Sequence, residues 1–234
     1  MKVIAVSPHL DDAAFSVGGA LAVFASAGHD VTVLTCFTGS VDRPTGFALT
    51  CQTDKGLAPD ADYLALRREE DRGAQAVLGA RLIHLPLVEA PYRGYDSAPA
   101  LFAGVRDDDD VWRDLVEQLR PVEADLWLAP QGLGAHVDHL QVVRAVAALQ
   151  RPTAWWRDAP YVLRAPDSQP SPDLPVGLTA VPLTADRGRR ADACACYATQ
   201  LGFQFGGELQ MREALAGLDE VVLADVLAGA MLAA

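Results

Sequence analysis

The sequence predicts an α/β fold in three layers, with a mostly parallel sheet between two layers of helices. Short apolar runs rich in β-branched residues alternate with longer amphipathic or alanine-rich segments through residue 150. Such alternation implies right-handed βαβ crossovers, which cover both faces of a parallel sheet with helices. Half of the 234 residues are hydrophobic, which is enough for one sizeable core, and no linker rich in Pro, Gly or Ser divides the chain. We therefore expect one domain over residues 1–234 with a Rossmann-like arrangement of its elements.

Each strand and helix is assigned from the spacing of its apolar residues. Strands are expected at 2–7, 31–37, 81–86 and 125–130, alternating with helices at 13–27, 62–79, 108–119 and 139–150. Beyond residue 150 the sequence predicts short strands near 153–157, 161–165 and 178–183, and helices at about 185–202 and 208–216. The connections 38–60 and 87–105 are long for a compact domain, and such connections tend to be binding loops or lids. They are expected either to contact a substrate or to be mobile surface loops.

An imidazole and two carboxylates follow the first predicted strand directly. The segment Ser7-Pro-His-Leu-Asp-Asp12 places them on the turn from this strand into the first helix. Open α/β sheets bind ligands in the crevice outside the carboxyl ends of their strands, and this turn lies at such an end. His9 and Asp12 are three residues apart, so their side chains can converge on one metal ion such as Zn²⁺. Asp11 lies between them and need not bind the ion. The turn carries no G-x-G-x-x-G pattern, so a dinucleotide site is not expected there.

A second polar cluster follows another predicted strand. Gly134-Ala-His-Val-Asp-His139 stands at the start of the 139–150 helix and holds two of the five histidines. Catalytic zinc usually takes three protein ligands and leaves a position for water, and this segment can supply the third ligand. Either cluster alone could be a helix cap with surface charge, but two such clusters after two strands favour a metal site. His29 and His84 belong to neither cluster and are expected to be structural.

The two clusters together resemble the paired signature of the LmbE-like, PIG-L family of zinc-dependent N-deacetylases. The resemblance covers most of the chain, because three further segments are similar to family segments: Leu66-Arg-Arg-Glu-Glu70, Asp158-Ala-Pro-Tyr161 and Tyr197-Ala-Thr-Gln200. It implies the LmbE-like version of the predicted fold. One departure is Gly39-Ser40, which stands where many relatives carry Gly-Glu, so the usual carboxylate contact to a sugar lacks its residue here.

The resemblance also implies a set of metal ligands and a base. His9, Asp12 and His139 are the implied ligands of Zn²⁺, with another divalent ion as the alternative. A metal held there lowers the pKa of a bound water toward neutrality and polarises an amide carbonyl. Asp11 is the implied general base, because it stands beside a ligand and can reach the water without occupying the metal.

Three more residues receive roles from the same resemblance. His136 is expected either to stabilise the tetrahedral oxyanion or to protonate the leaving amine, and Asp138 is expected to orient His136. Arg67 is expected to hydrogen-bond a sugar hydroxyl of the substrate. The alternative for Arg67 is an ion pair on the helix surface with Glu70 or Asp71.

These residues predict a zinc-dependent hydrolase that removes an N-acetyl or other N-acyl group from an amino sugar or a sugar-containing small molecule. Two alternatives stay open: a metal-bearing protein that binds a small ligand without turnover, and a metal-dependent esterase on the same scaffold. Asp11 favours the enzyme, because a pure binding site has no need of a spare carboxylate beside a ligand.

The composition argues against other classes of function. A formal net charge of −12 disfavours a nucleic-acid partner, since binding to phosphate backbones needs an excess of Lys and Arg. The acidic run 107–110 and the basic run 187–190 are both expected to be solvated. No apolar run has the length of a membrane span, and the four cysteines fit no zinc-ribbon spacing. A signal peptide before the first strand is not expected. We therefore expect a cytoplasmic protein with reduced thiols and a small-molecule N-acylated substrate, and a homo-oligomer is left open.

Overall fold

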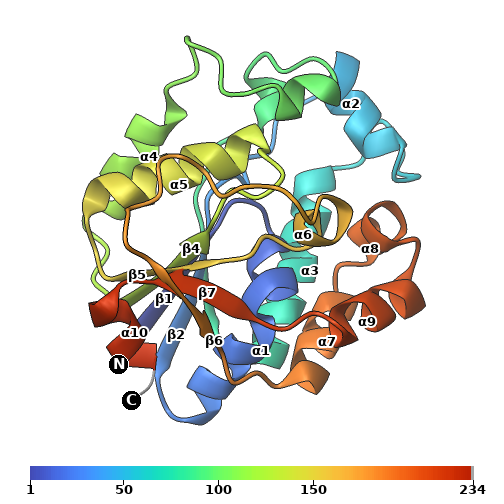
Figure 1. Cartoon of the computed structure of the whole chain (residues 1–234). Coiled ribbons are helices and arrows are strands. Elements are labelled where there is room, and N and C mark those ends of the chain that lie inside the picture. The colour runs from blue at the N-terminus through green and yellow to red at the C-terminus, as the bar shows by residue number, and fades with distance from the viewer. Residues whose placement is uncertain (233–234) are drawn as a thin grey trace.

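The computed structural model describes residues 1–232, and within them seven strands form one sheet in the order β3-β2-β1-β4-β5-β7-β6 (Figure 1). The strands are β1 (Lys2–Ser7), β2 (Asp30–Thr35), β3 (Arg81–His84), β4 (Leu126–Pro130), β5 (Thr153–Trp156), β6 (Thr179–Pro182) and β7 (Val221–Ala224). Neighbouring strands from β3 to β5 are parallel, whereas β7 runs antiparallel to both β5 and β6. The predicted α/β class with a mostly parallel sheet is confirmed.

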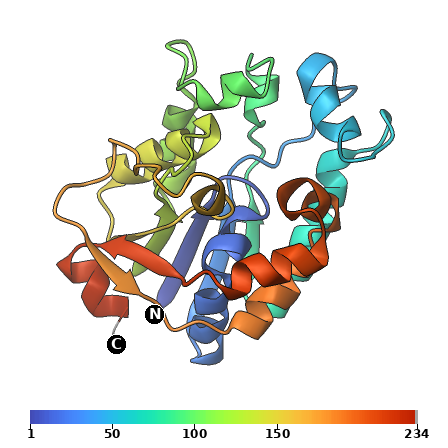
Figure 2. The same ribbon diagram turned by 45° about the vertical axis from the view of Figure 1, so that its right-hand side comes forward.

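Helices cover both faces of this sheet. They are α1 (Asp12–Ser26), α2 (Gly46–Thr53), α3 (Tyr63–Leu78), α4 (Val111–Leu119), α5 (Val137–Leu149), α6 (Tyr161–Arg164), α7 (Arg187–Ala195), α8 (Ala198–Phe205), α9 (Glu208–Ala216) and α10 (Val226–Leu232), with short 3₁₀ helices η1 (Ala90–Tyr92) and η2 (Pro99–Phe102). Figures 1 and 2 show α1, α3 and α7 on one side of the sheet and α4 and α5 on the other. Within residues 1–232 no helix combines the length and the apolar character that a membrane span requires.

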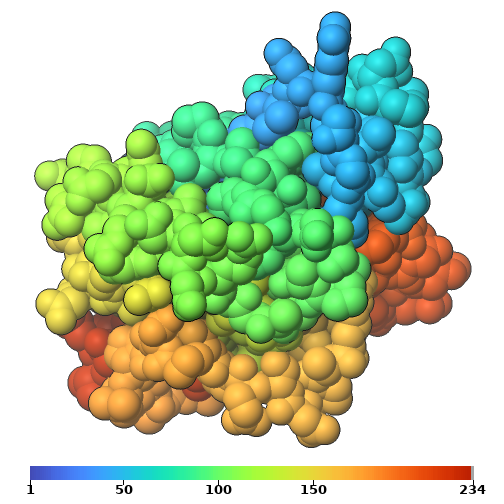
Figure 3. Space-filling model, turned by 90° about the horizontal axis from the view of Figure 1, so that it is seen from above, coloured from blue at the N-terminus to red at the C-terminus, as the bar shows by residue number. Residues whose placement is uncertain are grey.

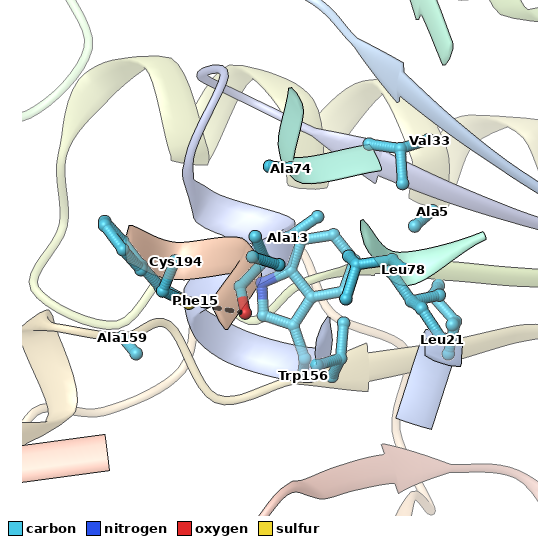
Figure 4. Packing of buried hydrophobic residues seen from close by; sticks show 14 of the residues in the cluster. Ala5, Ala13, Phe15, Leu21, Val33, Ala74, Leu78, Trp156, Ala159 and Cys194 are labelled. Atoms are coloured by element: carbon cyan, nitrogen blue, oxygen red, sulfur yellow. Dashed lines mark hydrogen bonds between the residues drawn. The ribbon is translucent and has the colours of Figure 1, made fainter. Parts of the chain in front are cut away.

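Two hydrophobic cores lie on opposite faces of the sheet, because side chains alternate along each strand. In β1, Val3 and Ala5 belong to the core beneath α1 and α3, whereas Ile4 and Val6 belong to the core beneath α4 and α5. Figure 4 shows the first core, in which the indole of Trp156 lies in the middle of the cluster. A sheet buried on both faces holds its strand ends in place, so the turns at those ends start from fixed points.

Several segments differ from the prediction. The predicted strand at 161–165 is wrong, because these residues form the helical turn α6, whose amides bond back to the carbonyls of Asp158 and Pro160. The predicted loop 38–60 contains helix α2. The predicted helix at 185–202 is two helices, α7 and α8, and both β7 and α10 lie beyond the last predicted element.

A buried ion pair ties the first helix to the C-terminal part of the chain. Glu220 accepts a hydrogen bond from the backbone amide of Gly19 at 2.9 Å, and a Cβ atom at Gly19 would lie only 2.6 Å from this carboxylate. Arg190 donates to the carbonyl of Phe15, and its Nε lies 3.4 Å from Glu220 Oε1. The prediction that the run 187–190 is solvated is therefore wrong for Arg190, which is 1% exposed.

Replacing Arg190 by Ala should lower the free energy of unfolding by about 3 to 5 kcal/mol, because the buried Glu220 carboxylate would lose its counter-charge. Arg187→Ala is the matched control, since Arg187 pairs with Asp219 on the surface and exposed pairs contribute about 0 to 1 kcal/mol. Urea unfolding followed by circular dichroism measures both variants. Equal losses of stability would contradict the prediction.

Candidate active site

The two polar clusters lie side by side at one edge of the sheet. β1 and β4 are parallel neighbours, with Val3 opposite Leu126 and Ala5 opposite Leu128. Parallel neighbours end at the same edge, so the turn from β1 into α1 meets the turn from β4 into α5. The backbone of the second turn is tightly wound, with positive φ angles of 82° at Gly134 and 59° at Ala135. At Gly134 a Cβ atom would lie 2.9 Å from the Tyr161 side chain, so both the conformation and the space favour glycine.

Three side chains from these turns, His9, Asp12 and His139, form a group that could hold a metal ion and is called the metal group below. The ligand atoms of His9, Asp12 and His139 all lie within 4.8 Å of one another. Asp12 Oδ2 is 3.2 Å from His9 Nδ1 and 3.2 Å from His139 Nε2. The buried Nε2 atom of His139 makes no well-directed hydrogen bond to any group in residues 1–232. A buried imidazole nitrogen without such a partner, beside a second imidazole and a carboxylate, is the donor set of a divalent metal site.

A carboxylate fixes the far nitrogen of each imidazole in this group. Asp138 Oδ2 is 2.9 Å from His9 Nε2, and Asp158 Oδ1 is 2.6 Å from His139 Nδ1. Such contacts set the tautomer and leave the other nitrogen free to bind a metal. Asp158 also accepts the backbone amide of Leu133 at 3.1 Å, which holds the β4 turn and the β5 turn together. The sequence analysis identified Asp158 only as part of a segment similar to a family segment and predicted no role for it.

Electrostatics favour positive charge between the three side chains. Burial lowers the pKa of His139, but the carboxylates of Asp12 and Asp158 outweigh it and raise this pKa to about 9. Burial raises the pKa of Asp12, yet the imidazoles of His139 and His9 hold it well below its ordinary value. A carboxylate kept ionised between two imidazoles suits a divalent cation at the same point.

A second group, formed by His9, His136 and Asp138, also brings its ligand atoms within 4.8 Å. Asp138 is fully committed elsewhere, however. Its Oδ1 lies 2.7 Å from the guanidinium of Arg93. Its Oδ2 is in hydrogen-bond contact with His9 Nε2 and accepts the backbone amide of Ala90. The adjacent guanidinium disfavours a second cation, so the first group is the better metal site.

The contacts of Asp138 also differ from the predicted ones. Its carboxylate makes its hydrogen bonds to His9, Ala90 and Arg93, and not to His136. The bond that does orient His136 comes from the backbone amide of Asp138, which donates to His136 Nδ1 at 3.2 Å. A neutral His136 therefore carries its proton on Nε2. Burial lowers the pKa of His136 to about 3, so the neutral form is the one present at physiological pH.

Asp11 stands beside the metal group without belonging to it. The carboxylate is 3% exposed and lines a cavity, with Oδ1 3.3 Å from Arg67 Nη2. Its buried Oδ2 has no hydrogen-bond partner among the described residues. Burial raises the pKa of Asp11, against the opposing effect of Arg67. One carboxylate oxygen is thus left free beside the group that could hold a metal.

Arg67 is buried and bridges two carboxylates. Besides Asp11, its guanidinium pairs with Glu89, and only 5% of the residue is exposed. The alternative of a helix-surface ion pair with Glu70 or Asp71 is therefore wrong, because Glu70 instead accepts hydrogen bonds from Thr199. Arg67 also lines the cavity, so the predicted contact with a substrate stays a prediction.

Comparison with known proteins gives one family match that spans both polar clusters. The model of the PIG-L family, described as GlcNAc-PI de-N-acetylase, matches residues 4–150. The chain belongs to this family. It is 36% identical to 2'-N-acetylparomamine deacetylase of Streptomyces fradiae over 68% of this chain and 57% of that protein. It is 32% identical to 1D-myo-inositol 2-acetamido-2-deoxy-alpha-D-glucopyranoside deacetylase of Corynebacterium glutamicum (strain R), over 64% and 54% of the two chains. The chain thus spans a little more than half the length of these curated relatives.

Solved structures of PIG-L-like deacetylases are similar over nearly the whole chain. The zinc-inhibited form of teicoplanin deacetylase Orf2 is 25% identical with a TM-score of 0.79, covering 95% of this chain and 97% of that one. The A40926 pseudoaglycone deacetylase Dbv21 is 30% identical with a TM-score of 0.75, covering 95% and 96%. The predicted family and its fold are confirmed by these matches.

The Gly39-Ser40 pair keeps the glycine of the family's Gly-Glu pair and departs from it only at Ser40. A Cβ atom at Gly39 would lie 2.6 Å from the carbonyl oxygen of Pro86, so only glycine fits where β2 leaves the sheet. Ser40 bonds Asp62 at 3.0 Å, outside the cavity. The carboxylates that do line the cavity beyond the two clusters are Glu89 and Asp54.

A cavity of about 280 Å³ opens above the metal group. Its floor is polar, and aromatic side chains from separate segments stand around it: Phe47, Phe102, Tyr161 and Phe203. Both long connections, 38–60 and 87–105, contribute, and Figure 3 shows the blue-to-cyan and green segments side by side on the face seen from above. The predicted binding role of these connections fits their place at the cavity.

Asp158→Asn should weaken metal binding by about tenfold to a hundredfold, because His139 would lose the carboxylate that fixes its ring. Calorimetric titration of metal-free protein with zinc measures the affinity. The control is Asp167→Asn, a change at an exposed carboxyl of the same segment, which should leave the affinity unchanged. Identical affinities for the two variants would remove Asp158 from the metal site.

Proposed function

We propose that the protein is a metal-dependent amidohydrolase that removes an N-acetyl or other N-acyl group from an amino sugar or a sugar-containing small molecule. The observation that carries this proposal is the carboxylate oxygen of Asp11 that has no hydrogen-bond partner among residues 1–232 and is buried in the cavity beside the His9, Asp12 and His139 group. Binding alone does not require such a group. A hydrolase requires it, because the water that attacks an amide must give up a proton.

Zinc is the ion we propose for this site. Two imidazoles and one carboxylate are the ligand types that catalytic zinc takes in hydrolases. The buried Nε2 atom of His139 faces the Asp12 carboxylate and makes no well-directed hydrogen bond to any group in the described part of the chain. When bound, zinc supplies a Lewis acid for the substrate carbonyl and lowers the pKa of a water molecule. Residency in the cytoplasm stays a prediction of the sequence, which leaves the oligomeric state open.

The protein side chains then divide the proton transfers between them. Asp11 accepts a proton from the attacking water, and the same proton can pass on to the leaving amine nitrogen as the C–N bond breaks. His136 Nε2–H donates to the carbonyl oxygen as negative charge develops there. The lowered pKa of His136 supports this role over protonation of the amine. A neutral imidazole can donate a hydrogen bond through Nε2–H, but giving that proton up would leave an imidazolate, so it is too weak an acid for the amine.

The proposed substrate is a small sugar amide. The relatives named above act, by their names, on an acetylated paromamine and on an acetamido-glucopyranoside of inositol. A cavity of about 280 Å³ lies near the lower end of ligand-pocket sizes, which suits one acetylated sugar ring above the metal group. The remainder of a larger substrate would lie outside, against the aromatic side chains at the rim.

Asp11→Asn should retain zinc and the fold but lose about two to four orders of magnitude in kcat, the usual contribution of positioned proton transfer. Asp12→Asn should instead lose metal affinity, because Asp12 faces both imidazoles. Zinc stoichiometry by elemental analysis and acetate release from N-acetylated amino sugars measure the two effects. If Asp11→Asn sheds the metal while Asp12→Asn retains it, the assigned roles are reversed and the mechanism is wrong.

Arg67→Ala should raise KM for the sugar substrate and also lower kcat, since its guanidinium faces the cavity and contacts the Asp11 carboxylate. The zinc content should not change, because Arg67 contacts no member of the metal group. Arg68→Ala is the control, as this neighbour bonds Thr38 and Ser40 away from the cavity. Steady-state kinetics with unchanged KM and kcat in Arg67→Ala would exclude both roles.

A further inference from the structure

Arg93 occupies an unusual place behind the metal group. Its side chain is 11% exposed, and it does not line the cavity. The guanidinium lies over the ring of Phe37 at 4.8 Å, on the side of the site away from the substrate space. A charged residue buried there, in the connection after η1, has no direct access to a small substrate in the cavity.

All three nitrogens of this guanidinium have partners that hold it in one orientation. Nε and Nη2 donate to the two carboxylate oxygens of Asp109 at 3.2 and 3.0 Å, and Nη1 donates to the carbonyl of Val88 at 2.7 Å. Tyr95 donates its hydroxyl to Asp109 at 2.9 Å. Asp109 is therefore not part of a solvated acidic run, as the sequence predicted, but one side of a buried clamp.

The guanidinium of Arg93, held by Asp109 and the carbonyl of Val88, also contacts Asp138. Arg93 Nη2 lies 2.7 Å from Asp138 Oδ1, while the other oxygen of Asp138 accepts from His9 Nε2 at 2.9 Å. Asp138 is 0% exposed, so Arg93 supplies a positive charge in direct contact with this buried carboxylate and holds it in place. A continuous chain of contacts thus runs from Asp109 through Arg93 and Asp138 to the ring of a metal ligand.

We propose that Arg93 is a positioning residue that fixes the ring of His9 through the Asp138 carboxylate and thereby sets the metal affinity of the site. This inference rests on the proposed metal site. A planar fork can hold Asp109 and Asp138 at once, which a single ammonium group cannot do with the same geometry. The connection 87–105 therefore shapes the metal site from behind as well as lining the cavity in front.

The test is cobalt(II) binding, which reports both affinity and ligand geometry through visible absorption. Arg93→Gln should bind cobalt about tenfold more weakly than the natural sequence and shift its absorption bands. Arg106→Gln is the matched control, because Arg106 lies in the same part of the chain but pairs with Asp108 on the surface. It should match the natural sequence in both readouts.

A double-mutant cycle separates positioning from general support of the fold. In the Asp138→Asn background, Arg93→Gln should cause no further loss of cobalt affinity, because the contact that transmits its effect is already altered. If Arg93→Gln does not fold, the same cycle is run with Arg93→Lys. This variant should lose less cobalt affinity than Arg93→Gln when Asp138 is present, and none when Asp138 is replaced by Asn. Independent, multiplicative losses would overturn the proposal.

Two further outcomes distinguish this proposal from the one on function. Natural protein that binds no cobalt contradicts the metal site and with it the role of Arg93. Natural protein that binds cobalt, with Arg93→Gln unchanged in affinity and spectrum, overturns the positioning role alone and leaves the proposed hydrolase intact.

Discussion

The parallel pairing of β1 with β4 is the constraint on which the site depends. Each strand ends in a turn that carries an imidazole and carboxylates, and neither turn alone holds enough ligands for a catalytic metal. Hydrogen bonding between the two strands brings the turns together, so that Asp12 Oδ2 lies 3.2 Å from both His9 Nδ1 and His139 Nε2. The two hydrophobic cores matter to function for this reason, since they fix the strand ends from both faces. A slip of the pairing would separate the three side chains before it changed the class of fold.

Burying several ionised groups close together is costly, and the structure offsets this cost by alternating their signs. The metal group is surrounded by carboxylates that face imidazoles on one side and guanidinium or backbone amides on the other. Arg67 compensates Asp11, and Arg93 compensates Asp138. Within residues 1–232, Asp11 keeps one oxygen without a hydrogen-bond partner, and that departure from complete pairing is what a general base needs. Stability and chemistry therefore make opposite demands at this single atom.

Prediction from sequence succeeded where the signal was local. The strands β1 and β4 are short apolar runs, and the clusters that follow them are contiguous, so their chemistry can be recognised without a partner. The roles of Asp158, Arg93 and Arg190 were not predictable in this way, because each is defined by a residue far away in the chain. From the sequence alone Arg190 belongs to a basic run that is expected on the surface, and only the structure shows that Glu220 lies beside it. Helix α6 was missed for a related reason, since the four residues after Pro160 carry too little periodicity to separate a turn of helix from a short strand.

The part of the chain beyond the alternating strands and helices completes the site that the first part begins. Asp158 follows β5 and holds the ring of His139, and Tyr161 in α6 packs edge-on against the same ring with centroids 5.2 Å apart. Phe203 reaches the cavity from α8. The metal group is thus set mainly by two turns that any chain with these motifs would share. The rim of the cavity, in contrast, is formed by residues of α2, η2, α6 and α8, and the packing of these helices depends on many distant contacts. Changes in these four elements can alter which small molecule fits without moving His9, Asp12 or His139, so ligand choice and the metal group can vary separately on this scaffold.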